Sequence, residues 1–215
     1  RGGPFVSRST YLLGEEFRAL DAHGTADSLG ASLVIPLVRS SALNLRVITS
    51  IESRRLEDIV GLSSSVMRKR ADFLQLGISG DMRDSFLQGA LTAFQGTLAI
   101  GKLKLDSPLA AAADAATAGT QGGYAKFVAN VYRLEGLTEN WRLTAMYTGQ
   151  WALGNLDSSE KFSVGGLTGV RAYPSGEAAG DDAQLVQLEL RHQGGSLGPG
   201  DRKSTRLNSS HVALS

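Results

Sequence analysis

Apolar and polar residues alternate along most of this chain with a period of two, which is typical of β-strands that have one face against an apolar phase. The pattern is clearest at 44–54, where Leu45, Val47, Thr49 and Ile51 share one face and the other is polar except for Ile48. The same alternation occurs at 28–37, 141–153 and 184–191, and in weaker form at 9–19, 70–79, 85–105 and 123–134. It predicts about eight strands, each near the roughly 9–11 residues that a tilted strand needs to cross a bilayer.

The connections between these strands fall into two classes. Tight links are expected at 39–42, 80–85 and 137–140, and long ones at 58–69, 106–122 and after 157, with a single short link at 22–26 on the long side. Short turns at one end and long loops at the other are typical of an outer-membrane barrel, whereas a soluble sandwich mixes loop lengths at both ends. We therefore predict an all-β fold, an antiparallel transmembrane β-barrel with long extracellular loops. A soluble β-protein is the alternative.

Three segments stand apart from the strand pattern. The alanine-rich stretch 107–123 is expected to be a mobile extracellular loop with at most one helical turn. The start RGGPFVSRST has no Met, basic n-region or apolar h-region, which favours a fragment of a longer protein. Residues 201–215 abandon the alternation and resemble a translated linker, so we expect a non-native read-through tail outside the fold; a native polar tail is the alternative.

The amino-acid composition excludes several classes of functional site. The 215 residues carry a formal charge of +1 and no cysteine, which leaves no nucleic-acid footprint, no disulfide and no thiol chemistry. His23, His192 and His211 lie far apart in sequence, and the glycines at 165–169 do not match a phosphate-binding motif. We therefore predict a protein that is not an enzyme, with no cofactor, no metal site, no nucleic-acid partner and no small-molecule substrate.

One stretch carries a family resemblance. Residues 158–192, SSEKFSVGGLTGVRAYPSGEAAGDDAQLVQLELRH, contain E-x-F-x-x-G-G, V-R-x-Y and G-D-D in order. This resembles the signature of the two-partner secretion transporters, the haemolysin secretion/activation family (ShlB/FhaC/HecB type). The resemblance continues more loosely over 14–40, 53–58, 74–85 and 148–162. One position departs from it, because Ala172 stands where the superfamily mostly has glycine.

The resemblance implies a 16-stranded barrel preceded by two POTRA domains and a plug helix. Such a barrel carries a large partner exoprotein, typically a haemolysin or an adhesin, across the outer membrane of a Gram-negative bacterium without ATP. Residues 1–200 would then be a partial barrel, about strands 5–12, with the signature loop at 157–183. The expected partners are the secreted exoprotein and outer-membrane lipid. A barrel-assembly factor of the same superfamily and a passive porin are the alternatives.

The resemblance also implies a role for the loop residues. The family's loop folds back into the lumen, and its arginine pairs with an acidic residue of the inner wall; here that arginine is Arg171, with a partner expected after residue 192. A solvated arginine in a surface loop is the alternative. The loop positions so assigned are Gly165, Gly166, Val170, Arg171, Ala172, Tyr173, Gly180 and Asp181.

The alternation itself supplies a second group of candidate site residues. Charged residues on the polar face of the strands are expected to face the lumen: Arg46, Glu52, Arg54, Arg142, Glu189 and Arg191. They either contact a passing polypeptide or hydrate the lumen, and the sequence leaves both open.

Overall fold

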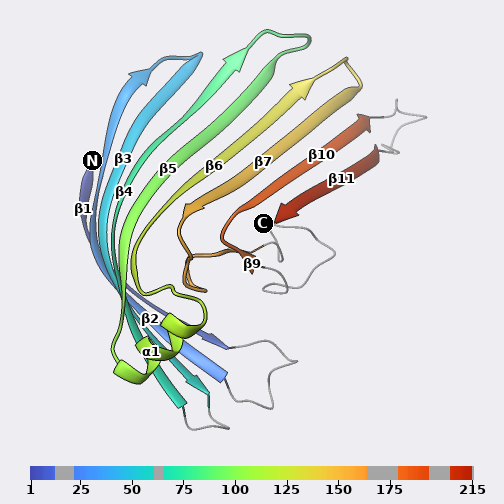
Figure 1. The fold of residues 1–215 in the computed structure, drawn as a ribbon. Coiled ribbons are helices and arrows are strands. Elements are labelled where there is room, and N and C mark those ends of the chain that lie inside the picture. Colours follow the sequence, from blue (N-terminus) through green and yellow to red (C-terminus); the bar gives the residue numbers. More distant parts are fainter. Residues whose placement is uncertain (13–21, 61–64, 164–178, 194–203, 215) are drawn as a thin grey trace.

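A computed structural model describes residues 1–12, 22–60, 65–163, 179–193 and 204–214. Nine strands form one strongly curved antiparallel sheet in the order β1-β2-β3-β4-β5-β6-β7-β10-β11 (Figure 1). In the described part of the chain β1 and β11 are the two edges, so the sheet is an open section and not a closed barrel. Every neighbouring pair is antiparallel, as a meander of hairpins requires.

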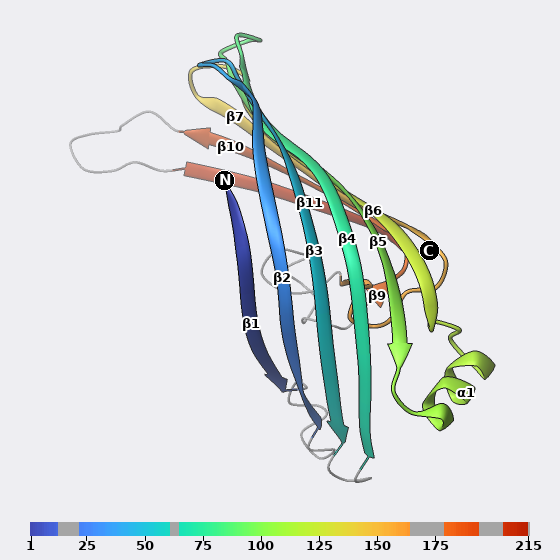
Figure 2. The same ribbon diagram turned by 90° about the vertical axis from the view of Figure 1, so that its left-hand side faces the viewer.

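The strands are long for a globular protein. Their bounds are β1 Gly2–Leu12, β2 Ala22–Arg39, β3 Leu43–Val60, β4 Ser65–Asp84, β5 Ala90–Leu105, β6 Gly122–Gly136, β7 Trp141–Leu153, β10 Ala183–Gln193 and β11 Ser204–Leu214. A helix, α1 (Pro108–Ala116), follows β5, and two short strands, β8 (Phe162–Ser163) and β9 (Ala179–Gly180), pair with each other. The turns after β2, β4 and β6 lie at one end of the sheet, and α1 lies at the other (Figures 1 and 2).

The convex face of the sheet is apolar over a membrane-sized band. Along β4 the outward positions between Asp72 and Asp84 carry no charge: Leu74, Leu76, Ile78, Gly80 and Met82. Four of these five side chains are large and apolar, and all four are well exposed. The span from 74 to 82 matches the roughly 9–11 residues with which a tilted strand crosses the hydrocarbon layer. The aromatic rings of Phe127, Trp151 and Tyr147 lie on the same face.

The concave face, called the inner wall below, is largely polar and holds the small core. Ala71, Phe73 and Leu103 form a buried apolar cluster there on β4 and β5. Gly101 lies opposite Tyr124, and the Tyr124 ring covers it so closely that an added Cβ would lie 2.6 Å from the ring. No helix in the described ranges is long and apolar enough to span a membrane.

The predicted fold class is confirmed, but several predicted boundaries are wrong. The first strand, β1, begins at Gly2 and not at residue 9, while positions 13–19 of the predicted strand lie outside the described residues. The predicted link at 22–26 lies inside β2. The long loop expected at 58–69 is much shorter, because β3 continues to Val60 and β4 begins at Ser65. The errors at 22–26 and 58–69 arise where the strands extend beyond the apolar band, so that the outward positions are no longer regularly apolar and the alternation is lost.

Two further segments differ from expectation. The alanine-rich loop contains a nine-residue helix, α1, which is more than one turn; Ser107 caps it through Oγ, which accepts a hydrogen bond from the Ala110 amide (3.4 Å). Residues 204–214, expected to lie outside the fold, form β11 and pair with β10 along the whole strand. The exclusion of this segment from the sheet was therefore wrong, while its non-native origin stays a prediction.

Candidate functional site: a loop base held on the inner wall

The chain leaves β7 at a glycine and turns back over the inner wall. Gly154 has φ +101°, a left-handed conformation that glycine adopts without a steric penalty. The segment that follows buries Leu156 completely and reaches β8. Phe162 then pairs with Gly180, and Ser163 with Ala179. We call residues 154–163 the loop base. Its end, β8, is paired with β9, through which the chain returns to the sheet, on the concave side (Figure 1).

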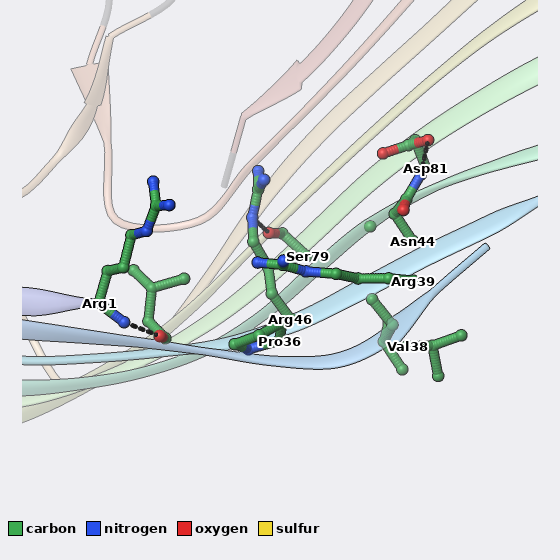
Figure 3. A pocket seen from close by; sticks show the side chains of 11 residues that line it. Arg1, Pro36, Val38, Arg39, Asn44, Arg46, Ser79 and Asp81 are labelled. Atoms are coloured by element: carbon green, nitrogen blue, oxygen red, sulfur yellow. Dashed lines mark hydrogen bonds between the residues drawn. The ribbon is translucent and has the colours of Figure 1, made fainter. Parts of the chain in front are cut away.

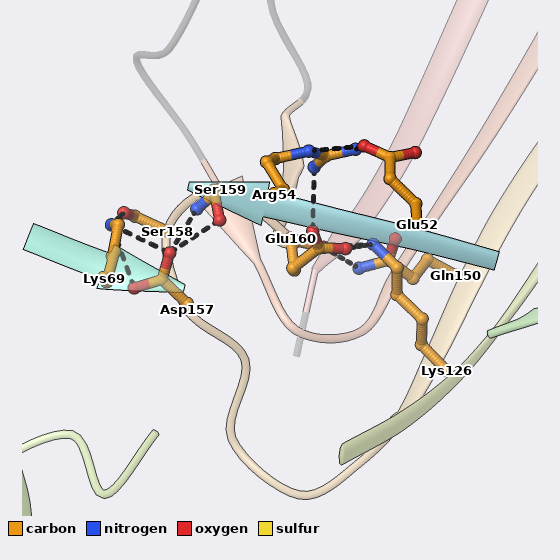
Figure 4. Close-up of polar contacts among 9 residues, drawn as sticks. All are labelled: Glu52, Arg54, Lys69, Lys126, Gln150, Asp157, Ser158, Ser159 and Glu160. Carbon is orange, nitrogen blue, oxygen red and sulfur yellow. Dashed lines mark hydrogen bonds and ion pairs between the residues drawn. The ribbon is translucent and has the colours of Figure 1, made fainter. Parts of the chain in front are cut away.

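Glu160 is the main anchor of the loop base. Its carboxylate accepts a hydrogen bond from Arg54 Nη1 of β3 (3.0 Å) and forms an ion pair with Lys126 Nζ of β6 (2.9 Å). Its backbone carbonyl accepts from Lys126 Nζ (2.7 Å) and from Gln150 Nε2 of β7 (3.3 Å). One buried residue of the loop thus joins three strands of the wall (Figure 4).

Arg54 is itself held in place by its neighbours on the wall. Its guanidinium pairs with Glu52 (2.9 Å) two residues earlier and lies 5.0 Å above the centre of the Phe73 ring. Because these contacts fix the guanidinium before the loop docks, less side-chain entropy is lost when Glu160 binds it.

Asp157 supplies a second anchor on β4. Its carboxylate pairs with Lys69 Nζ at 2.9 Å, and the Lys69 side chain, only 4% exposed, also pairs with Asp58 at 3.3 Å. Burial raises the pKa of Asp157, but the hydrogen bonds from Ser159 and Lys69 and the charge of Lys69 outweigh it, so this pKa lies below its ordinary value. The carboxylate is therefore ionised at neutral pH.

The return side of the loop is tied to the same place. Asp181 Oδ1 accepts from the Leu156 amide (3.1 Å) and pairs with Lys161 Nζ (3.2 Å). The Asp181 carbonyl accepts from Gln150 Nε2 (3.0 Å), and Asp182 accepts from the Ala152 amide. Both ends of the signature loop therefore meet at the inner wall.

The six charged residues predicted to face the lumen lie on one face of the sheet. Arg46 lies in register opposite Ser79 on β4, and the same row of paired residues continues across β5, β6 and β7 to Leu185 on β10, so all of these positions share one face. Residues an even number of positions from these share that face. All six candidates satisfy this rule: Arg46, Glu52, Arg54, Arg142, Glu189 and Arg191.

Two of these six residues are covered by the loop base, and the other four lie away from it. Glu52 and Arg54 lie against the loop base, as described above. Arg142 lies opposite Arg191, which pairs with Glu189 at 3.1 Å near the short-turn end of the sheet. Arg46 donates to Ser79 Oγ (2.8 Å).

Arg46 also lines a hollow on the inner wall near the short-turn end. The hollow has a volume of about 350 Å³ and is lined by residues that include Val34, Pro36, Arg46, Ser79 and Asp81 (Figure 3). Asp81 accepts a hydrogen bond from Asn44 Nδ2 (3.0 Å) at its rim. The wall therefore has an open hollow with both polar and apolar residues at this end and is covered by the loop base at the other.

Most of the predicted signature-loop positions lie outside the described residues: Gly165, Gly166, Val170, Arg171, Ala172 and Tyr173. Gly180 and Asp181 are described, and both belong to the return side of the loop. Sequence reasoning missed Lys69, Lys126, Asp157 and Glu160 as site residues. For Lys69 a signal existed, because it shares a strand face with the buried Ala71 and Phe73.

The described residues contain no group of three or more histidine, cysteine or acidic side chains that could hold a metal ion. The arrangement is one of positioning: a polar wall, and a loop attached to it by ionic contacts that can be broken and remade.

The sheet is an open, curved section. Its outer face has an apolar band that matches the thickness of the hydrocarbon layer, and its inner face is a charged wall with a docked loop. These features define part of an outer-membrane β-barrel. The family model of the haemolysin secretion/activation protein ShlB/FhaC/HecB matches residues 5–207. The chain belongs to this family of two-partner secretion transporters, which are proteins of the outer membrane of Gram-negative bacteria.

Relatives and solved structures agree with this assignment. The heme/hemopexin transporter protein HuxB of Haemophilus influenzae is 28% identical over 197 residues, which is 89% of this chain and 34% of HuxB. HuxB of strain 86-028NP is 25% identical over 182 residues, 85% of this chain and 32% of that protein. The chain thus spans about a third of the length of these relatives.

The fold is similar to that of CdiB. The Escherichia coli protein gives a TM-score of 0.67 at 14% identity, covering 98% of this chain and 43% of CdiB. CdiB from Acinetobacter baumannii gives 0.58 at 14% identity, covering 97% and 36%.

Proposed function

We propose that this chain forms part of an outer-membrane pore through which a partner exoprotein of the haemolysin or adhesin type is secreted, and that the signature loop obstructs this pore until the exoprotein enters. The supporting observation is the position of Glu160. A loop that begins with the family's signature residues is bound by this carboxylate to β3 and β6 on the face turned away from lipid.

The chemistry of the wall fits an unfolded polypeptide as the transported species. Paired charges such as Glu189–Arg191 and Glu52–Arg54 lie along the described part of the wall, so the wall presents charges of both signs to water and to a passing chain. An unfolded chain has exposed backbone donors and acceptors, which a hydrated wall leaves solvated and does not hold.

Displacement of the loop requires that the ion pairs of Glu160 be broken. Glu160, Arg54 and Lys126 are mostly buried in the docked state, with side-chain exposures of 8%, 26% and 13%. Separating them requires rehydration of all three charges, which the aqueous lumen and the charges of the entering chain supply. No nucleotide is needed for such an exchange of ionic partners.

Secretion of a partner exoprotein tests the proposal. In a Gram-negative host that makes both, the exoprotein should reach the cell surface, and it should remain in the periplasm when the transporter is omitted. Equal surface exposure with and without the transporter would contradict the proposal. Loss of other outer-membrane barrels on deletion would support an assembly factor, and unselective uptake of solutes without secretion would support a porin.

A further inference from the structure

A row of cations crosses the convex face next to the apolar band, on the side of the long loops. Arg55 on β3 is paired in register with Arg70 on β4, and Arg70 with Lys104 on β5. All three side chains are exposed. Figure 2 shows β3, β4 and β5 side by side on this face. We call Arg55, Arg70 and Lys104 the cation row.

Like charges directly opposite each other across strands destabilise a sheet. The cation row places two such contacts in succession, where the paired Cα atoms of neighbouring strands are only about 4.5–5.5 Å apart. Arg70 has a partner in Asp72 (3.0 Å), and Arg55 lies in register opposite Asp27 of β2, but that carboxylate is bound by Arg8. Neither Arg55 nor Lys104 forms an ion pair with any residue in the described ranges. The fold therefore keeps an unfavourable arrangement that an external anion would relieve.

The surroundings of the cation row form a shallow site. A hollow of about 530 Å³ is lined by residues that include Arg8, Arg55, Arg68 and Arg70. Three carboxylates also line this hollow: Asp27 is bound by Arg8 and Glu57 by Arg68, each at 2.6 Å, and Asp106 lies close enough to Arg68 to add to the rise in the pKa of that arginine that Glu57 causes. Lys102 adds a further exposed cation on the same face of β5, opposite Asp72.

The site lies at the edge of the apolar band, a position that favours a lipid headgroup as its ligand. The apolar band begins with the row Ile51, Leu74 and Ile100, whose exposures are 59%, 48% and 53%; on this face only the row Ser53, Asp72 and Lys102 lies between it and the cation row. Ammonium and guanidinium groups at the edge of a hydrocarbon layer lie at the depth of lipid phosphates, and guanidinium groups bind phosphate bidentately. Because long loops of outer-membrane barrels face the cell exterior, this edge belongs to the outer leaflet.

We propose that the cation row and Lys102 bind the phosphate groups of an anionic glycolipid of the outer leaflet, with its acyl chains against Ile51, Leu74 and Ile100. The bound headgroup neutralises the facing cations and fixes the depth of β3, β4 and β5 in the membrane. This site lies on the opposite face from the loop base and does not depend on the secretion role.

The test compares lipid binding by the protein purified from outer membranes and placed in nanodiscs. The probes are bis-phosphorylated lipid A, its dephosphorylated form and inorganic phosphate. The triple variant R55Q/R70Q/K104Q should bind bis-phosphorylated lipid A at least about tenfold more weakly than the original protein, given the contribution of each basic residue at a membrane surface. The control R46Q/R142Q/R191Q removes three charges from the inner wall and should bind as the original does.

A second measurement separates lipid binding from a change in folding. In detergent without phospholipid the R55Q/R70Q/K104Q variant should have a melting temperature equal to or above that of the original, because facing cations have been removed. Equal lipid A binding by the original and this variant would overturn the proposal. So would equal binding of dephosphorylated lipid, or displacement of lipid A by micromolar inorganic phosphate, which would indicate a free-anion site.

Discussion

The carboxylate of Glu160 lies 3.0 Å from the guanidinium of Arg54, a residue 106 positions earlier in the chain. This contact joins the start of the signature loop to the third strand of the sheet across the inner wall. Because Lys126 binds the same carboxylate from β6, one side chain of the loop contacts two cations of the wall. The loop base is therefore an integral part of the lumen surface in this state.

Replacement of Glu160 by Gln should release the loop base. The amide keeps the shape of the side chain but leaves Arg54 and Lys126 without their shared counter-charge, and breaking a buried pair in this way costs about 3 kcal/mol or more. Hydrogen exchange of the backbone amides of 154–163 should become faster in E160Q.

A matched control for E160Q exists on the other face. Glu57 forms an ion pair with Arg68, and that arginine side chain is 62% exposed. Exposed surface pairs of this kind contribute little to stability, so E57Q should leave exchange in the loop base unchanged. Equal protection of 154–163 in E160Q and the original would show that Glu160 is not the anchor.

Acid should undock the loop through Asp157. Its pKa in the docked state is below the ordinary value of about 3.9, so its contribution to docking is complete above that value and is lost as the pH falls through the lower, docked-state pKa. Single-channel conductance in planar bilayers should therefore rise on acidification below about pH 4.

The variant D157N tests the origin of this acid transition. Since an amide does not ionise, D157N should already show raised conductance at neutral pH and a smaller change on acidification. A transition of the original size in D157N would assign the acid effect to other carboxylates.

Gly101 should tolerate no larger residue. A Cβ at this position would lie 2.6 Å from the ring of Tyr124, which is itself buried and has little room to move. G101A should destabilise the barrel by about 1–3 kcal/mol, as overpacking does, and lower the temperature at which it unfolds in heat-modifiability gels. G123A is the control, because the atom nearest to an added Cβ there is 3.9 Å away. Identical unfolding temperatures for the two variants would contradict the packing described for Gly101.

The periodicity of the sequence predicted the faces of the sheet better than the ends of its strands. The strand predicted at 141–153 has those bounds in the structure, because its outward side chains, such as Trp141, Tyr147 and Trp151, alternate along its length with mostly polar ones. The part of β2 around His23 and Thr25 lies beyond the apolar band, so its side chains follow no apolar alternation and the segment resembles a turn.

The loop anchors could not be predicted for a different reason. Lys69 and Asp157 are 88 residues apart in sequence, and Arg54 and Glu160 are 106 apart. No local pattern specifies such pairs, which exist only because the loop turns back over the wall after Gly154. The charge of Lys69 on an otherwise buried face of β4 was the available signal, since a buried lysine requires a partner.

Arg171 remains a prediction of the family resemblance. If it anchors the loop tip inside the lumen, R171A should abolish secretion of the exoprotein while the barrel still assembles and remains heat-modifiable. The control R39A removes an arginine at the short-turn end of β2 and should secrete normally. Normal secretion by R171A would remove the anchoring role from this residue.

Site-specific crosslinking in the secreting cell tests the central claim most directly, namely that the concave face lines the path of the exoprotein. A photoreactive residue is placed either at Arg46 on the inner wall or at Ile78 on the outer face. Ile78 belongs to the neighbouring strand β4 and precedes Ser79, the hydrogen-bond partner of Arg46. The account predicts that the exoprotein, trapped during secretion, crosslinks at position 46 and not at position 78. Crosslinking at position 78 alone, or at neither position while secretion proceeds, would contradict it.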